Sequence, residues 1–98
     1  MDVLREILYP AVEEAQGIPG SERLRAAPES PLFGEGGLDS MGLVRFIVIV
    51  EERIEDRTSL ALTLASDKAM SRRQSPFRTL GALADFIAEC LAEEGFDG

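Results

Sequence analysis

Apolar residues recur at helical spacing in three stretches of the chain. The first runs from Asp2 to about Gln16, and its apolar positions are Val3, Leu4, Ile7, Leu8, Ala11, Val12 and Ala15. This i, i+3, i+4, i+7 spacing is typical of one face of a helix, and Asp2 is placed to cap it. Pro10 lacks a backbone donor and costs about 3 kcal/mol inside a helix. The stretch is therefore either one helix that is kinked near Tyr9 or two shorter helices, and we predict the single bent helix.

The stretch from Ser40 to Asp56 is compatible with two structures. Its centre, Phe46 to Val50, is β-branched and aromatic, which by propensity indicates a buried strand. A broad helical face is equally present, with Asp39 as its N-cap. That face consists of Met41, Val44, Ile47, Val48, Glu51 and Ile54. The charged run Glu51 to Arg57 continues a helical surface more naturally than a strand, so the pattern slightly favours the helix.

The third stretch predicts a helix that begins after Thr79, its N-cap, and ends at Gly95. Its apolar face consists of Leu80, Leu83, Ala84, Ile87, Cys90 and Leu91. On that face Cys90 is expected to be a small buried hydrophobe. We expect residues 1–2 and 95–98 to be frayed, because chain ends make few contacts.

The remaining segments are predicted mainly from their glycine and proline residues and from the spacing of their apolar residues. Gly17 to Leu38 is rich in glycine and proline and predicts a long loop, with one helical turn within Glu22 to Ala27. Its expected anchors are Leu24, Leu32 and Phe33. Thr58 to Ala65 alternates loosely and is compatible with extended backbone. Asp67 to about Ser71 predicts a short helix, and Phe77 is expected to close the core.

Size and composition restrict the fold. The chain has 98 residues, of which 45% are hydrophobic and 29% charged. This is typical of one globular domain, residues 1–98, with a limited core, and it favours a fold with local contacts such as a helical bundle.

Charge and apolar content exclude several partners. The net charge is −8, from 18 acidic and 10 basic residues. That balance argues against a nucleic-acid partner, which would need a basic surface, and suits proteins with basic docking patches. The longest apolar run is far below the roughly 20 residues that span a bilayer. With a single cysteine and no secretory signal, the chain is predicted to be cytoplasmic.

The candidate chemistry is centred on Ser40. The run Gly37-Leu38-Asp39-Ser40-Met41 follows a glycine-rich turn, Phe33 to Gly37, and precedes the apolar stretch. Its serine is expected on an exposed elbow in the first turn of a helix. Because the chain contains no histidine and no spacing typical of a metal site, we expect no metal and no enzymatic activity. A displayed but unactivated serine indicates a residue that another enzyme modifies.

With its flanks, this segment resembles the prosthetic-group attachment site of acyl and peptidyl carrier proteins, where an Asp-Ser-Leu triplet carries 4'-phosphopantetheine. Met41 stands where that family usually has leucine, a near-isosteric exchange. The resemblance extends roughly from Val3 to Leu91. It implies an all-α bundle of three to four helices with a long loop between helices 1 and 2, and it favours the helix for the ambiguous stretch after Ser40.

The resemblance also implies a function. A phosphopantetheinyl transferase would move the arm from coenzyme A to Ser40, and Asp39 would help it hold magnesium while Leu38 pins the turn. The protein would be a monomeric acyl carrier that delivers thioesters between ligases or synthases of a specialised fatty-acid or polyketide pathway. The partner-reading residues would be Met41, Val44, Arg45, Glu51 and Glu52. A cleft for short cargo would be lined by Val44, Val48, Leu62 and Leu64.

Alternatives remain open from the sequence. The acidity favours acyl cargo over aminoacyl or peptidyl cargo, and a helical interaction module of the same fold could keep Ser40 unmodified. Arg72, Arg73 and Arg78 form a basic patch in an acidic chain. They are either solvated charges paired with surplus carboxylates or a contact to the arm's phosphate or to a partner.

Overall fold

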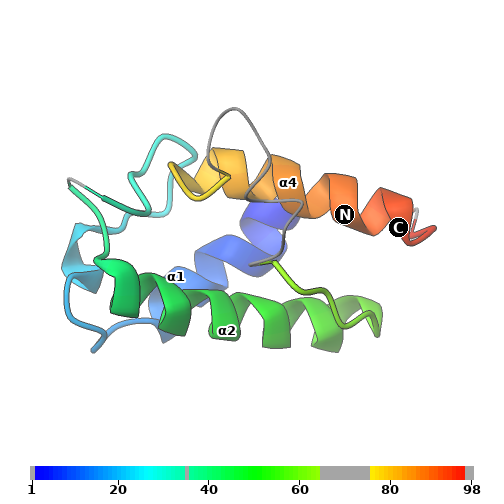
Figure 1. Cartoon of the computed structure of the whole chain (residues 1–98), viewed down its shortest axis with the longest axis horizontal. Coiled ribbons are helices and arrows are strands. Elements are labelled where there is room, and N and C mark those ends of the chain that lie inside the picture. Colours follow the sequence, from blue (N-terminus) through cyan, green and yellow to red (C-terminus); the bar gives the residue numbers. More distant parts are fainter. Residues whose placement is uncertain (1, 35, 65–75, 97–98) are drawn as a thin grey trace.

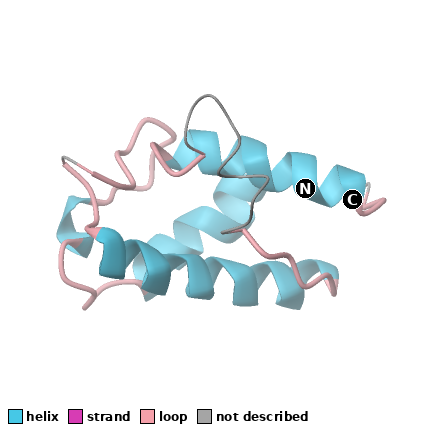
Figure 2. Ribbon diagram, viewed as in Figure 1, coloured by secondary structure: helices cyan, strands magenta, loops and turns pink. Residues whose placement is uncertain are grey.

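The protein is mostly helical. A computed structural model describes residues 2–34, 36–64 and 76–96, and in this part of the chain three helices and no β-strand are present (Figures 1 and 2). The radius of gyration is 12.3 Å, close to the value of about 13 Å expected for a compact domain of 100 residues. The prediction of a mostly helical fold is therefore confirmed for the described residues, and the strand considered for residues 46–50 is excluded.

The first helix changes its winding before Pro10. It begins as a π-helical segment, η1 (Leu4–Leu8), and continues as α1 (Tyr9–Glu14). The Tyr9 N–H donates to the Leu4 carbonyl, an i to i−5 bond that widens the turn. Pro10 then lies in the first turn of α1, where its missing N–H costs least. The irregularity before the proline is thus a π-helical turn that ends directly before Tyr9, where the bend was predicted.

The start of this helix is capped as expected. Asp2 Oδ1 accepts a hydrogen bond from the Arg5 N–H at 3.3 Å, and Glu6 Oε2 accepts one from the Asp2 N–H at 2.8 Å. Reciprocal bonds of this kind satisfy donors that a helix end leaves without partners. Asp2, which we expected to be frayed, is therefore held in place.

The second helix, α2 (Ser40–Thr58), is the longest element and confirms the helical interpretation of this stretch. Ser59, in the left-handed region at φ 62°, ends it. Residues 60–64 after it form no regular element, so the extended segment considered there is not a strand. The short helix predicted from Asp67 to Ser71 lies outside the described residues.

The third helix, α4 (Leu80–Glu93), begins and ends where its signals predict. Thr79 Oγ1 accepts from the Ala82 N–H at 3.1 Å. At the other end Gly95, at φ 83°, donates to the Ala92 carbonyl, and the Phe96 N–H donates to the Leu91 carbonyl at 2.9 Å. This is a Schellman motif, which also brings half-buried Phe96 against the core. Gly95 and Phe96 are therefore not frayed, contrary to our expectation.

The first helix occupies the centre of the arrangement. It contacts α2 through both η1 and α1 and contacts α4 through η1, and in Figure 1 α2 and α4 lie along opposite edges of the view with this helix between them. The fully buried side chains come from all three helices and from the loops; the largest are Phe46, Phe86, Ile7, Leu8, Leu32, Leu38, Ile54, Leu64, Leu80, Leu83, Ile87 and Val50. Two partly exposed ion pairs, Arg53–Glu14 at 2.8 Å and Arg57–Glu6 at 3.5 Å, join α2 to the first helix. Pairs of this exposure each add at most about 1 kcal/mol, so burial holds the helices together.

Predicted core residues were only partly correct. Phe77 is 8% exposed and closes the core as expected. Cys90 is half-buried against the core rather than enclosed by it. Phe86, which the predicted face of the third helix omitted, is fully buried.

Candidate functional site

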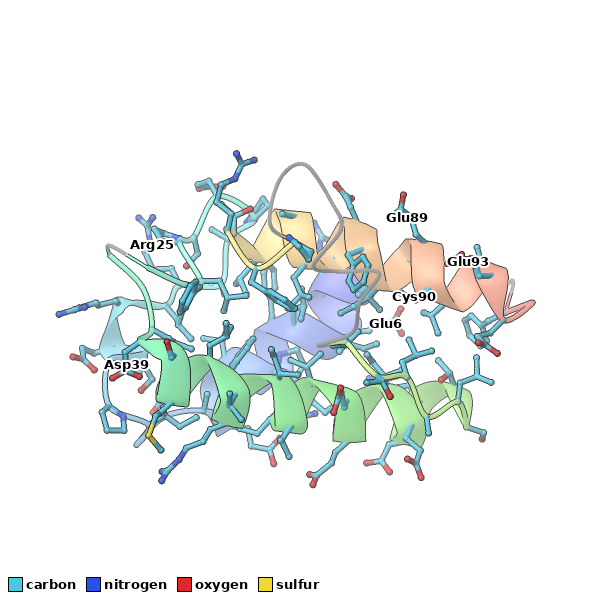
Figure 3. All side chains as sticks on the ribbon, viewed as in Figure 1. Glu6, Arg25, Asp39, Glu89, Cys90 and Glu93 are labelled. Carbon is cyan, nitrogen blue, oxygen red and sulfur yellow. The ribbon has the colours of Figure 1, made fainter. Side chains whose placement is uncertain are left out.

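Ser40 is an exposed residue at the first position of α2. The residue before it, Asp39, has extended backbone (φ −80°, ψ −179°), and its Oδ1 accepts from the Gly42 N–H at 2.7 Å. Figure 3 shows Asp39 at this end of α2. This cap bond uses one carboxylate oxygen of Asp39, an exposed residue directly before Ser40. The positively polarised end of a 19-residue helix thus presents a serine hydroxyl and a carboxylate together.

The turn before Ser40 is tightly built from backbone. Leu38 is fully buried, and its N–H donates to the Leu32 carbonyl at 2.8 Å, while its carbonyl accepts from the Gly34 N–H at 3.1 Å. Gly37 has no room for a side chain, because an added Cβ would lie 2.7 Å from the Leu32 carbonyl carbon. The predicted role of Leu38 in pinning the turn is consistent with this burial.

The long loop is fastened to the start of α4. The Leu32 N–H donates to the Arg78 carbonyl at 3.1 Å, the Leu80 N–H to the Ser30 carbonyl at 3.1 Å, and the Gly81 N–H to the Pro28 carbonyl at 2.8 Å. A single helical turn is present in the loop, the 3₁₀ segment η2 (Ser21–Arg23), but it begins one residue before the predicted range 22–27 and ends four residues before the end of that range. Backbone hydrogen bonds therefore hold the described part of the segment 17–38 in place. Through Leu32, which bonds to both Arg78 and Leu38, they connect the start of α4 to the turn before Ser40.

Ser30 lies among these three hydrogen bonds between residues 28–32 and residues 78–81, which we call the clamp. It is fully buried, its Oγ accepts from the Arg25 N–H at 3.0 Å, and its hydroxyl donates to the Pro31 carbonyl at 3.3 Å. The Ser30 hydroxyl thus supplies an acceptor for the Arg25 N–H and a donor for the Pro31 carbonyl, two loop backbone groups that have no helix or sheet partner. The sequence analysis did not identify Ser30. The signal present was a serine directly before Pro31 and two residues after Pro28 in a loop.

The predicted partner-reading residues divide into two kinds. Met41 and Val44 are 70% and 61% exposed, and Arg45 and Glu52 are also exposed. Glu51 is half-buried, and its Oε2 accepts from the Leu64 N–H at 2.8 Å. Glu51 therefore holds the segment after α2. The other four predicted residues lie on the exposed surface of α2, beyond Ser40.

Two expectations about apolar packing were wrong. The face of α2 that meets the core carries Gly42, Phe46, Ile47, Val50 and Ile54. Met41, Val44 and Val48, assigned to one face with Ile47 and Ile54, lie on the opposite side because α2 rests on the first helix along only one stripe. Among the described residues, those expected to line a common cleft face different ways: Leu64 is fully buried, whereas Val44 and Val48 face solvent.

Phe33 was wrongly expected to anchor the loop. It is 40% exposed, whereas its neighbour Leu32 is fully buried. Phe33 pairs with Leu38 in an isolated β-bridge, and successive side chains on extended backbone point to opposite sides. With Leu32 inward, Phe33 is turned outward. The large exposed hydrophobics of the described residues, Phe33, Met41, Val44 and Val48, thus all lie on the turn before Ser40 or on α2 after it.

Two further kinds of site are absent from the described residues, a metal centre and a membrane-spanning helix. No group of three or more histidine, cysteine, aspartate or glutamate side chains in this part of the chain is placed to hold a metal ion. None of its helices has the length and apolarity needed to cross a bilayer. Arg78 is exposed, while Arg72 and Arg73 lie outside the described residues. Comparison with protein-family models, with curated proteins and with solved structures finds no match to the chain.

Proposed function

We propose that this protein is a carrier that holds a 4'-phosphopantetheine arm on Ser40, within an acyl-carrier-like bundle. The observation that carries the proposal is an exposed serine at the first position of a long helix, preceded by a tight glycine turn and the capping residue Asp39. The chain contains no histidine to activate this hydroxyl. Ser40 therefore fits a substrate residue that another enzyme modifies better than it fits a catalytic nucleophile.

The residues present fit such a group. Its phosphodiester would sit at the N-terminus of α2, where the helix dipole and unpaired backbone donors favour an anion. Gly34 has open space around its Cα, and Ser40 is exposed, so a second protein can approach this turn. Buried Leu38 and close-packed Gly37 keep the hydroxyl at a fixed position during that approach.

The loading reaction exchanges a phosphoanhydride bond of coenzyme A for a phosphodiester bond to serine. The Ser40 oxygen forms a bond to the phosphorus that bears the pantetheine of coenzyme A. The bond from that phosphorus to adenosine bisphosphate breaks, and the serine proton passes to the transferase. Exposed Asp39 would help the transferase hold its magnesium ion. When bound, the arm supplies a thiol that holds carboxylic acids as thioesters.

The exposed apolar stripe of α2, Met41, Val44 and Val48, would bind the partner enzymes of the carrier. Met41 and Val44 follow Ser40 along α2, and Arg45 and Glu52 add charges to the same exposed surface. An apolar strip of this kind on a small acidic protein favours docking to enzymes with complementary apolar and basic surfaces. These enzymes would be the transferase and the ligases or synthases of a specialised fatty-acid or polyketide pathway in the cytoplasm, with the carrier acting as a monomer.

The proposal is tested by mass spectrometry of the intact chain. Incubation with a broad-specificity phosphopantetheinyl transferase, magnesium and coenzyme A should add the mass of one arm. A Ser40→Ala variant should gain nothing. A Ser59→Gly variant, which removes another exposed hydroxyl at a left-handed position, should be modified like the parent. Failure of the folded parent chain to gain mass would overturn the proposal.

The same exposed stripe supports a second candidate, a helical interaction module that is never modified. Met41, Val44 and Val48 would then bind a partner without any arm on Ser40. The mass measurement separates the two functions, because only the carrier gains mass. Aminoacyl or peptidyl cargo in place of acyl cargo is a further alternative within the carrier function.

A further inference from the structure

A pocket of about 530 Å³ lies between the end of α1 and the loop that follows it. Its volume falls within the range of about 300–1,000 Å³ that is typical of small-molecule sites. Its apolar wall is formed by Val12, Ile18 and Leu24, and its polar lining by Gln16, Ser21 and Glu22. Neither the candidate site at Ser40 nor the stripe along α2 uses these residues.

The loop segment that supplies part of this lining adjoins the turn before Ser40. Gly20 lies between the lining residues Pro19 and Ser21, and an added Cβ there would lie 3.7 Å from Leu38 Cδ2. Two residues beyond Ser21, the Arg23 guanidinium donates to the Gly37 carbonyl at 3.3 Å. The loop segment 20–24 therefore contacts the pair of residues just before Asp39 and Ser40. The turn that carries Ser40 and the pocket are therefore joined by one short loop segment, which a flexible arm on Ser40 would have to follow.

The lining of the pocket favours a positive charge. Its only charged residue is Glu22, and no lysine or arginine is among its lining residues. Gln16 and Ser21 offer further oxygen acceptors, and the carbonyl end of α1 carries the negative pole of that helix. Leu24 is 7% exposed, and Val12 and Ile18 are half-buried, which provides apolar contact for a small branched side chain. A carboxylate would be disfavoured in such a pocket, and an ammonium group next to an apolar side chain would be favoured.

We infer that this pocket is the resting site of a small aminoacyl group carried on the arm at Ser40. The side chain of the cargo lies on Val12, Ile18 and Leu24, and its ammonium group faces Glu22, Gln16 and Ser21. The inference rests on the proposed carrier function, and it selects aminoacyl over simple acyl cargo on the chemistry of the pocket. Resting there removes part of the cargo from water until a partner enzyme withdraws it.

The test uses two arms that differ only in the amine. The transferase loads the chain with arms ending in a valyl group or in a 3-methylbutanoyl group, each joined by a stable amide in place of the thioester. These cargos share one carbon skeleton. Backbone amide chemical shifts of Gly17, Ile18 and Ser21, compared with those of the chain bearing the unloaded arm, report occupancy of the pocket. We expect clear shifts for the valyl arm and weaker ones for the 3-methylbutanoyl arm.

A matched pair of variants tests the charge. Glu22→Gln should lower the valyl-induced shifts about twofold or more, toward those of the 3-methylbutanoyl arm. Glu29→Gln, which removes an exposed loop carboxylate outside the pocket, should leave them unchanged. Equal shifts from both arms, or shifts confined to other parts of the chain, would overturn the inference alone. Absence of any gain in mass with unmodified coenzyme A would overturn the carrier function and this inference with it.

Discussion

Gly37 is the residue whose size most directly shapes the turn before Ser40. Its backbone φ is not in the left-handed region, but its Cα packs so closely on the Leu32 backbone that a Cβ would overlap it. Gly36, one residue earlier, has the opposite property: its φ is 82°, and the nearest atom to an added Cβ is a Pro31 side-chain carbon at 3.8 Å. Two adjacent glycines are therefore required for different physical reasons, one for space and one for conformation.

Alanine substitutions separate these two requirements. Gly37→Ala should lower the free energy of unfolding by about 3 kcal/mol, because the backbone of Leu32 must move. Gly36→Ala should cost only about 1 kcal/mol of conformational strain. Urea unfolding followed by circular dichroism measures both. Equal costs would mean that the turn relaxes around the new methyl group and does not hold Ser40 in one position.

At the scale of elements, α2 presents two apolar stripes to different surroundings. Phe46, Val50 and Ile54 are fully buried against the rest of the protein, whereas Val44 and Val48 face solvent. The sequence pattern shows both stripes, because Val, Ile, Leu and Phe fill nearly every position from Leu43 to Val50. Only the packing of the first helix on one side of α2 decides which stripe contributes to stability.

Val50→Ala and Val48→Ala form a matched test of this assignment. Val50 is fully buried, so its truncation should cost about 2 kcal/mol from lost burial and the cavity left behind. Val48 is 47% exposed, and its truncation should change the free energy of unfolding by no more than about 0.5 kcal/mol. A larger effect at Val48 than at Val50 in urea unfolding would contradict the orientation of α2.

The clamp between the loop and α4 gives a second prediction at this scale. Ser30→Ala leaves the Arg25 N–H without its acceptor and should cost about 2 kcal/mol. Faster hydrogen exchange should appear at the amides of Leu32 and Leu80, which bond across the clamp. Ser59→Gly should leave both the stability and these exchange rates unchanged, because Ser59 is exposed and left-handed. Unaltered exchange in Ser30→Ala would show that the clamp does not depend on this hydroxyl.

At the scale of the whole molecule, the net charge of −8 dominates long-range interactions. The acidic surface includes Glu89 and Glu93, which Figure 3 shows on the outer side of α4. A basic partner enzyme would be attracted over distances comparable with the Debye length, about 10 Å at 0.1 M salt. The apolar stripe near Ser40 would then determine the final contact, because it lies where the proposed modification takes place.

Salt should therefore slow the modification of Ser40. Raising the ionic strength from about 0.05 M to about 0.5 M should lower kcat/KM of a transferase with a basic docking face several-fold, through slower association. Unfolding measured at both salt concentrations controls for any loss of fold. A kcat/KM that is independent of salt would assign recognition to the apolar contacts alone.

The sequence by itself determined where α2 begins and where α4 begins and ends. Asp39, Thr79 and Gly95 act on backbone groups within a few residues of themselves, so their effects can be predicted from local spacing. The exposed position of Ser40 follows from the same local rules. Phe33 and Val48 could not be predicted in this way, because their exposure depends on which neighbouring surface covers Leu32 and Phe46.

Only the tertiary structure decided how the loop reaches α4, which stripe of α2 is buried, and where a pocket forms beside the turn. These features join residues that are far apart in the sequence, such as Ser30 with Leu80 and Arg23 with Gly37. Helix caps depend on short-range hydrogen bonds that a sequence displays directly. Side-chain burial depends on the packing of whole elements, and many arrangements of the same apolar pattern would bury similar areas.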